Sequence, residues 1–193
     1  MSTKHRGREP VASHSLSATW GTTAAERARP FPCDPLLPEA DAALYRGVTI
    51  AAPPERVFRW LCQLRVAPYS YDWIDNLGRQ SPRQLTPGLD ELAVGQEVMS
   101  IFLLADFRVP EHLTLRTKPG ALGERAFGAT VVSYVVVPET ANACRLLVKI
   151  VARFPGGLLG PLLRHLLPWG DLVMMRRQLL NLKELAEAGE RTA

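Results

Sequence analysis

The chain has 193 residues, of which 47% are hydrophobic and 22% are charged, with a formal net charge of +4. This length and composition are those of one ordinary globular domain that can bury a core without disulfide bonds or a structural metal. A small positive excess does not by itself indicate a nucleic-acid partner, because such partners require basic residues that cluster.

The three cysteines, Cys33, Cys62 and Cys144, are odd in number and widely spaced. They form no Cys-x-x-Cys pair and no His pair has metal-ligand spacing, so the sequence predicts neither a disulfide framework nor a metal site. No apolar signal segment follows the basic start, and no apolar run reaches the roughly 18–20 residues of a membrane span. We therefore expect a cytoplasmic protein without stable insertion into a membrane.

Residues 1–41 differ in composition from the rest of the chain. They are rich in Ser, Thr, Ala and Arg, contain few large apolar residues, and include Pro30, Pro32, Pro35 and Pro38. This composition predicts a disordered tail that ends in an extended proline-rich linker. Its five basic residues are balanced by five acidic ones, which argues against a nucleic-acid-binding arm. We expect the folded domain to span 42–190.

The first predicted elements are a strand and a helix. Residues 45–51, YRGVTIA, alternate in polarity and include β-branched residues, which predicts a strand. Pro53 and Pro54 end this strand, and Pro54 suits the first turn of a helix. Residues 55–64 then carry apolar side chains at helical spacing, so we expect a helix there.

The next segment, 67–78, reads APYSYDWIDNLG and concentrates aromatic rings. Tyr69, Tyr71 and Trp73 lie within five positions, although the whole chain has only 4 Tyr and 4 Trp. We expect a short irregular helix or a lid-like loop here. Because Tyr and Trp suit places where one end of the ring is dry and the other wet, we expect them to wall or cover a pocket. The alternative is that Trp73 and one Tyr anchor the short helix in the core.

Four strands are predicted after that segment, at 94–103, 108–117, 127–137 and 144–154. The last one alternates basic residues on one face with apolar residues on the other, which indicates a half-solvated antiparallel strand. The basic face holds Arg145, Lys149 and Arg153, but no aromatics are interleaved, so we expect no nucleic-acid partner. In 108–117, one face holds His112, Thr114 and Arg116; we favour a solvent face over a strip that orients a ligand.

The C-terminal part contains an apolar stretch and then a long predicted helix. Residues 156–170, GGLLGPLLRHLLPWG, are broken by prolines and charges, which favours a helix entry packed on the core over a membrane-surface contact. Asp171 follows Gly170 and is predicted to cap the closing helix. That helix carries an apolar stripe formed by Leu172, Met175, Leu179, Leu182 and Ala186.

Three segments, in this order and spacing, resemble the SRPBCC superfamily, also called START-like or Bet v 1-like. They are VTIAAPPERVFRWLCQL (48–64), YSYDWIDNLG (69–78) with LAVGQEV (92–98), and GDLVMMRRQLLNLKELAE (170–187). The resemblance covers roughly 42–190 and leaves 1–41 without a counterpart. Within the superfamily, the sequence is similar to a bacterial branch of unassigned activity. It implies an α+β helix-grip fold, in which a curved antiparallel sheet wraps around a long C-terminal helix and two short helices follow the first strand.

The resemblance also implies an apolar cavity between sheet and closing helix, where family members bind lipids, polyketides, steroids, quinones or plant hormones. We therefore expect binding of a small hydrophobic molecule, such as a lipid, polyketide, quinone or other aromatic, with no assigned reaction, metal or other cofactor. The expected contributors to the cavity are Trp60, Tyr69, Tyr71, Trp73, Met99, Phe102, Tyr134, Met175 and Leu179.

Two alternatives stay open. Some family members are aromatases or cyclases, and a polyketide cyclase or aromatase-type enzyme needs a polar residue deep in the cavity; the candidates are Tyr71, His112 and Tyr134. The second alternative is a protein- or membrane-interaction module that uses 156–169. The sequence leaves the oligomeric state and the role of the tail open.

Overall fold

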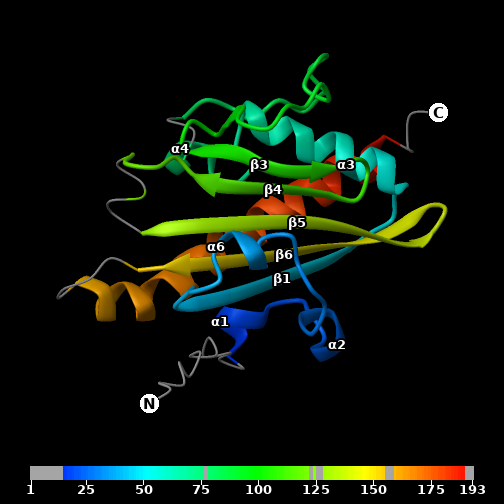
Figure 1. Cartoon of the computed structure of the whole chain (residues 1–193). Coiled ribbons are helices and arrows are strands. Elements are labelled where there is room, and N and C mark those ends of the chain that lie inside the picture. The colour runs from blue at the N-terminus through cyan, green and yellow to red at the C-terminus, as the bar shows by residue number, and fades with distance from the viewer. Residues whose placement is uncertain (1–14, 76–77, 122–123, 125–127, 155–158, 190–193) are drawn as a thin grey trace.

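The frame of the molecule is one sheet of six antiparallel strands in the order β1-β6-β5-β4-β3-β2. The structure is a computed structural model that describes residues 15–75, 78–121, 124, 128–154 and 159–189 (Figure 1). The strands are β1 (Ala42–Ile50), β2 (Glu97–Val98), β3 (Phe102–Arg108), β4 (His112–Thr117), β5 (Ala129–Thr140) and β6 (Ala143–Arg153). Figure 1 shows the long helix α6 (Leu159–Ala188) passing behind this sheet.

Two short helices follow the first strand, as expected. They are α3 (Pro54–Cys62), which continues as a 3₁₀ turn at Gln63–Arg65, and α4 (Asp72–Asp75). The apolar side of α3 packs with the inner face of the sheet and with α6, and these three elements enclose the main core. The predicted α+β helix-grip fold is therefore confirmed.

Two predicted strand ranges were wrong in detail. Residues 94–103 do not form one strand, because Met99 and Ser100 adopt positive φ values of 51° and 62°, which end β2 and turn the chain before β3. The strand predicted at 108–117 is also divided: β3 ends at Arg108 and β4 begins at His112. Pro110 lies in the turn between them, where its missing N–H costs no ladder hydrogen bond.

Helix α6 is continuous through the segment that was predicted to break it. It begins at Leu159 and includes Pro168, so Asp171 lies inside the helix and the predicted capping role is wrong. The side chain of Arg46 contacts this turn: its guanidinium donates to the carboxylate of Asp171 at 2.7 Å and approaches the carbonyl of Pro168 at 3.4 Å. A tertiary contact thus holds the turn that the local sequence marks as a boundary.

The partner in this contact is an arginine on the inner face of β1. Arg46 is fully buried, whereas the side chain of Asp171 retains 22% exposure. A second guanidinium nitrogen of Arg46 donates to the carbonyl of Tyr45 at 2.8 Å, and its Nε has no partner among the described residues. The ion pair therefore joins the first strand to the closing helix through the core.

The N-terminal segment 15–41 is ordered and packs on the domain, so the predicted tail is corrected for these residues; 1–14 lie outside the described residues. The segment contains α1 (Leu16–Thr19), α2 (Ala24–Arg27) and a 3₁₀ turn at Asp34–Leu36. Its few apolar side chains suffice because the outer face of β5 and β6 offers apolar partners. Phe31 and Cys33 are buried there against Val131, Leu147 and Val151.

The basic stripe of β6 is neutralised by acids of this same segment. Arg145 pairs with Glu26 at 2.7 Å, Lys149 with Asp34 at 2.5 Å, and Arg153 with Glu39 at 3.2 Å. The ammonium of Lys149 also lies over the rings of Phe31 and Tyr45, at 5.4 and 5.3 Å from their centroids. The predicted solvated face of β6 is therefore covered at Arg145 and Lys149, whereas Arg153 at the end of the strand stays exposed.

Close backbone approach also fixes the segment to β1. The N–H of Gly47 donates to the carbonyl of Trp20 at 3.1 Å. A Cβ at Gly21 would stand 2.1 Å from the carbonyl oxygen of Gly47, and Gly21 has a φ of +74°. Only glycine satisfies both the conformation and the spacing at this position.

If segment 15–41 is part of the folded domain, truncating its buried ring must destabilise the whole protein. We expect Phe31→Ala to lower the free energy of unfolding by about 3 kcal/mol, the usual cost of deleting a buried aromatic ring. The matched control is Leu36→Ala in the same segment, where the side chain is 44% exposed. Urea unfolding followed by far-UV circular dichroism measures both; equal stability of the two variants would contradict the packing.

The Arg46–Asp171 pair makes a second prediction. Asp171→Ala leaves a buried guanidinium without its counter-ion, and we expect a loss of about 3–5 kcal/mol of unfolding free energy. The double variant Arg46→Met/Asp171→Leu removes both charges and should recover most of that loss. The same urea titration compares the two; a double variant as unstable as the single one would show that the ion pair is not the important contact.

Candidate functional site

A cavity of about 420 Å³ lies between the inner face of the sheet and α6. Its lining is mainly apolar, with a few polar groups. The lining residues are Pro68, Ser70, Met99, Ile101, Phe102, Leu115, Thr130, Val132, Tyr134, Ile150, Asp171, Met174, Met175 and Gln178. The expected cavity between sheet and helix is thus present and is not filled by its own side chains.

Strand and helix periodicity place these side chains. On β5, Thr130, Val132 and Tyr134 alternate toward the cavity, because successive strand residues point to opposite faces. On α6, Asp171, Met175 and Gln178 are spaced i, i+4 and i+7, which puts them on one side of the helix. The polar groups therefore come from opposite walls of an apolar chamber.

A chain of hydrogen bonds crosses the cavity wall. The hydroxyl of Tyr134 donates to Oε1 of Gln178 at 2.8 Å, and Nε2 of Gln178 donates to the carbonyl of Pro68 at 2.6 Å. The hydroxyl of Ser70 donates to the carbonyl of Met174 at 3.0 Å. Burial, and secondarily the charge of Asp171, raises the pKa of Tyr134, so this phenol keeps its proton.

Asp171 is the acidic group of the cavity. Burial raises the pKa of its carboxyl to about 6, although Arg46 acts in the opposite direction. Its Oδ2 accepts from Arg46, and no described residue donates a hydrogen bond to Oδ1. A carboxyl with a pKa near neutrality and one free oxygen can accept a hydrogen bond from a ligand or exchange a proton with it.

Four of the nine expected residues lie together at the cavity. These are Met99, Phe102, Tyr134 and Met175. Leu179 is fully buried in the core and is not part of the lining. Trp60 is also a core residue, and its ring meets that of Tyr69 edge-to-face at 6.1 Å.

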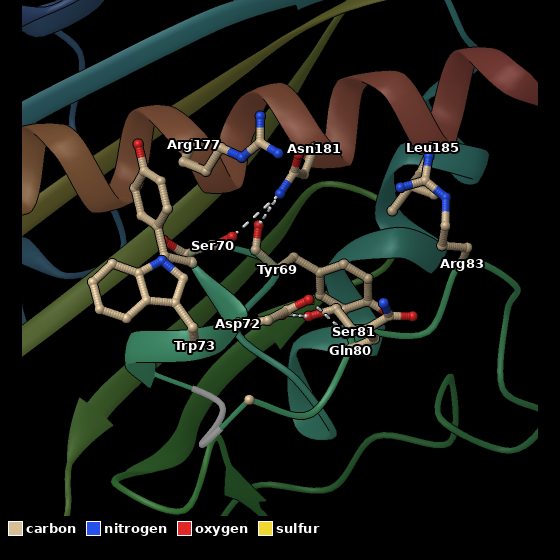
Figure 2. A pocket seen from close by; sticks show the side chains of 12 residues that line it. Tyr69, Ser70, Asp72, Trp73, Gln80, Ser81, Arg83, Arg177, Asn181 and Leu185 are labelled. Atoms are coloured by element: carbon tan, nitrogen blue, oxygen red, sulfur yellow. Dashed lines mark hydrogen bonds between the residues drawn. The ribbon is translucent and has the colours of Figure 1, made fainter.

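The other three expected residues, Tyr69, Tyr71 and Trp73, line a separate hollow of about 440 Å³, which we call the α4 groove. It lies outside the grip, between the segment around α4 and the C-terminal half of α6. Figure 2 shows Arg177 and Asn181 reaching from α6 on one side and Trp73 on the other. Tyr71 and Trp73 therefore border a pocket other than the cavity, whereas the ring of Tyr69 is buried in the core, as the alternative expected of one tyrosine.

The wall between cavity and groove is the short segment 68–70, since Ser70 lines both. Asn181 donates to the carbonyl of Tyr69 at 2.8 Å, as the dashed lines in Figure 2 show. Tyr69 has a φ of 54°, and its buried hydroxyl has no partner among the described residues. Side chains of α6 thus clamp an irregular piece of backbone against the helix.

The structure separates the three candidates for a catalytic polar residue. Only Tyr134 lines the cavity; Tyr71 lies in the α4 groove. His112 lies on the outer face of β4, where its Nε2 is 3.0 Å from Oδ2 of Asp106. This face of β4 points away from the cavity, but it is not the solvent face that was predicted, because Thr114 is buried and hydrogen-bonded to Ser133 at 2.9 Å.

The polar residues missed by the sequence prediction are Arg46, Ser70, Thr130, Asp171 and Gln178. Three of them carried a readable signal. Arg46 is separated from Leu44, Val48 and Ile50 by even numbers of residues. Its side chain therefore points to the same, otherwise apolar face of the strand. Asp171 and Gln178 fall on the same helix face as Met175, which interrupts the apolar stripe with polar groups.

Other chemistry finds little support in the described part of the chain. The described residues contain no cluster of three or more His, Cys, Asp or Glu that could hold a metal ion. The cysteines are unpaired and buried, and burial raises the pKa of Cys62 to about 12 and of Cys33 and Cys144 to about 11. Protonated, buried thiols are poor nucleophiles.

The proposed interaction segment 156–169 is described only in part. Residues 156–158 lie outside the described residues, and Leu166 and Trp169 of α6 are 58% and 56% exposed. No helix in the described ranges is both long and apolar enough to cross a membrane. An interaction through this segment stays a prediction.

Comparisons with known proteins add solved structures at low identity. A protein from Mesorhizobium loti is 15% identical with a TM-score of 0.48, over 78% of this chain and 98% of that one. A START superfamily protein from Mycobacterium smegmatis is 15% identical with a TM-score of 0.48, over 76% and 97%. Norcoclaurine synthase from Thalictrum flavum, solved with dopamine and hydroxybenzaldehyde, is 10% identical with a TM-score of 0.44, over 78% and 88%.

No family model matches the sequence, and no curated protein matches it either. The helix-grip fold of this chain is established by its own strand order and closing helix.

Proposed function

We propose that this protein binds a small hydrophobic molecule in the cavity between the sheet and α6. The observation that carries the proposal is the cavity itself, with about 420 Å³ of space and a mainly apolar lining that includes a few convergent polar groups. Small-molecule sites usually have this composition and volumes of about 300–1,000 Å³. A volume at the lower end of that range favours a single-chain lipid or a compact ring system, such as a polyketide, quinone or other aromatic.

The lining also supports tolerance toward ligand shape. Met99, Met174 and Met175 contribute flexible, polarisable side chains to one chamber. Methionines adapt to irregular apolar surfaces better than branched side chains do. We propose that Met99, Phe102, Tyr134 and Met175 contact the ligand, and that Trp60 and Leu179 support the core. The three unpaired cysteines support the expected cytoplasmic location.

A cavity-filling variant tests this proposal. We expect Met175→Trp to weaken binding of the fluorescent probe N-phenyl-1-naphthylamine by about tenfold or more, a change of about 1.4 kcal/mol, because the larger ring occupies the chamber. The matched control is Trp73→Ala in the α4 groove, which removes an exposed ring outside the cavity. Its affinity should match that of the wild type.

The measurement is a fluorescence titration of each variant, with a thermal melt to confirm that both are folded. Loss of probe binding in Trp73→Ala together with full binding in Met175→Trp would move the site from the cavity to the groove.

One observation favours a second candidate, a polyketide cyclase or aromatase-type enzyme. Asp171 faces the cavity with a pKa of about 6, which suits a general base near neutral pH. As a base, it would remove a proton from a carbon between two carbonyls. The freed electron pair would attack a third carbonyl of the same chain, and that oxygen would take the proton back from Asp171. Such a ring closure needs no external reactant.

For this candidate we expect a cyclised product when the protein is incubated with a linear poly-β-ketone thioester, and no product with Asp171→Asn, which cannot accept the proton. Liquid chromatography with mass spectrometry detects the product. Product from neither protein, or equal amounts from both, would leave ligand binding as the better-supported function.

A further inference from the structure

We propose that the cavity selects apolar ligands that carry a hydrogen-bond donor, a hydroxyl or an amine, and discriminates against carboxylates. The inference rests on the proposed function and names the chemical class of the ligand. It follows from the donors and acceptors that the lining side chains leave unused.

The hydroxyl donors of the lining are already engaged within the protein. A hydroxyl has one proton to give. That of Tyr134 goes to Gln178 at 2.8 Å, that of Ser70 to the carbonyl of Met174 at 3.0 Å, and that of Thr130 to the carbonyl of Gly128 at 3.5 Å. The amide of Gln178 donates one of its two protons to the carbonyl of Pro68 at 2.6 Å. One amide proton is left among these four side chains.

The acceptors of the same side chains are mostly unused. Each hydroxyl oxygen keeps lone pairs after it has donated its proton. The carboxylate of Asp171 has its Oδ2 on Arg46, while no described residue donates to its Oδ1. The polar part of the lining therefore presents acceptors to a ligand, and it is best satisfied by a ligand that donates.

The charge of the lining points the same way. Asp171 is the charged side chain among the described residues that line the cavity. Arg46 faces it from β1 but is fully buried behind it, and Tyr134 faces it from β5 as a neutral phenol. The described lining residues leave no cation for a ligand carboxylate, which would instead meet the charge of Asp171 in an apolar chamber where like charges repel strongly.

The test uses five ligands with the same ten-carbon chain: 1-decanol, decylamine, decyl methyl ether, decanoate and decane. Each competes with N-phenyl-1-naphthylamine for the wild-type protein at about pH 8, where Asp171 is ionised because its pKa is about 6. We expect decanol and decylamine to displace the probe at concentrations about tenfold or more below those of decanoate, a difference of at least about 1.4 kcal/mol. The ether lacks a donor and should compete no better than decane.

A pH series separates the two kinds of donor. Lowering the pH from about 8 to about 5 protonates Asp171 and removes the charge that attracts an ammonium group. Decylamine should then lose its advantage over decanol, while decanol itself changes little. An amine advantage that is the same at both pH values would exclude Asp171 as its origin.

Variants test the assigned residue. Asp171→Asn should abolish the amine advantage and improve decanoate relative to decanol. Because that change leaves Arg46 without its counter-ion, the Arg46→Met/Asp171→Leu variant provides a second, uncharged cavity, in which the amine advantage should also be absent. Retention of the advantage in both variants would overturn the assignment.

Different outcomes contradict the proposed function and the selectivity for donors. If neither the probe nor any of the five ligands binds the wild-type protein, the proposed function fails. If the probe binds but decanoate or the ether competes as well as decanol, the inference about donors fails and the proposed function stands.

Discussion

The buried ion pair between β1 and α6 is the interaction on which the rest of the architecture depends. Arg46 is fully buried, so its charge is tolerated only because Asp171 lies 2.7 Å away. The same guanidinium approaches the carbonyl of Pro168, which is the proline that weakens this turn of the helix. One side chain thus holds the helix continuous, fixes it across the first strand and gives the cavity its acidic group.

The sheet is covered on both faces, by different means. The inner face packs with α3 and α6 and leaves a chamber, whereas the outer face of β5 and β6 is covered by segment 15–41 without a comparable apolar area. Ion pairs such as Glu26–Arg145 and Asp34–Lys149 compensate for the small number of apolar contacts there. Because these pairs are partly shielded from water, they contribute more than fully exposed pairs would.

The sequence predicts those structural features that depend on neighbouring residues, and it misses those that depend on contacts between distant parts of the chain. The alternation in 144–154 assigned each side chain of β6 to the correct face, because the period of two is a property of the strand itself. The cover on that face was not predictable, since Glu26 meets Arg145 only after the chain has folded back over 119 positions. The prediction that Asp171 caps the helix was wrong for the converse reason. Gly170 followed by an aspartate is a good local capping signal, but a contact from β1 overrides it.

The aromatic segment shows the same limit at the scale of the site. Its composition indicated rings at the border of a pocket; Tyr71 and Trp73 lie at one, whereas the ring of Tyr69 is buried against Trp60. The side of the wall on which they lie depends on backbone conformation, since Tyr69 adopts a positive φ and Asn181 holds its carbonyl. The composition of a segment determines what kind of surface it forms. The contact from α6 determines which pocket that surface lines. Most of the polar residues that line the cavity therefore come from α6 and β5, and the aromatic segment contributes Ser70.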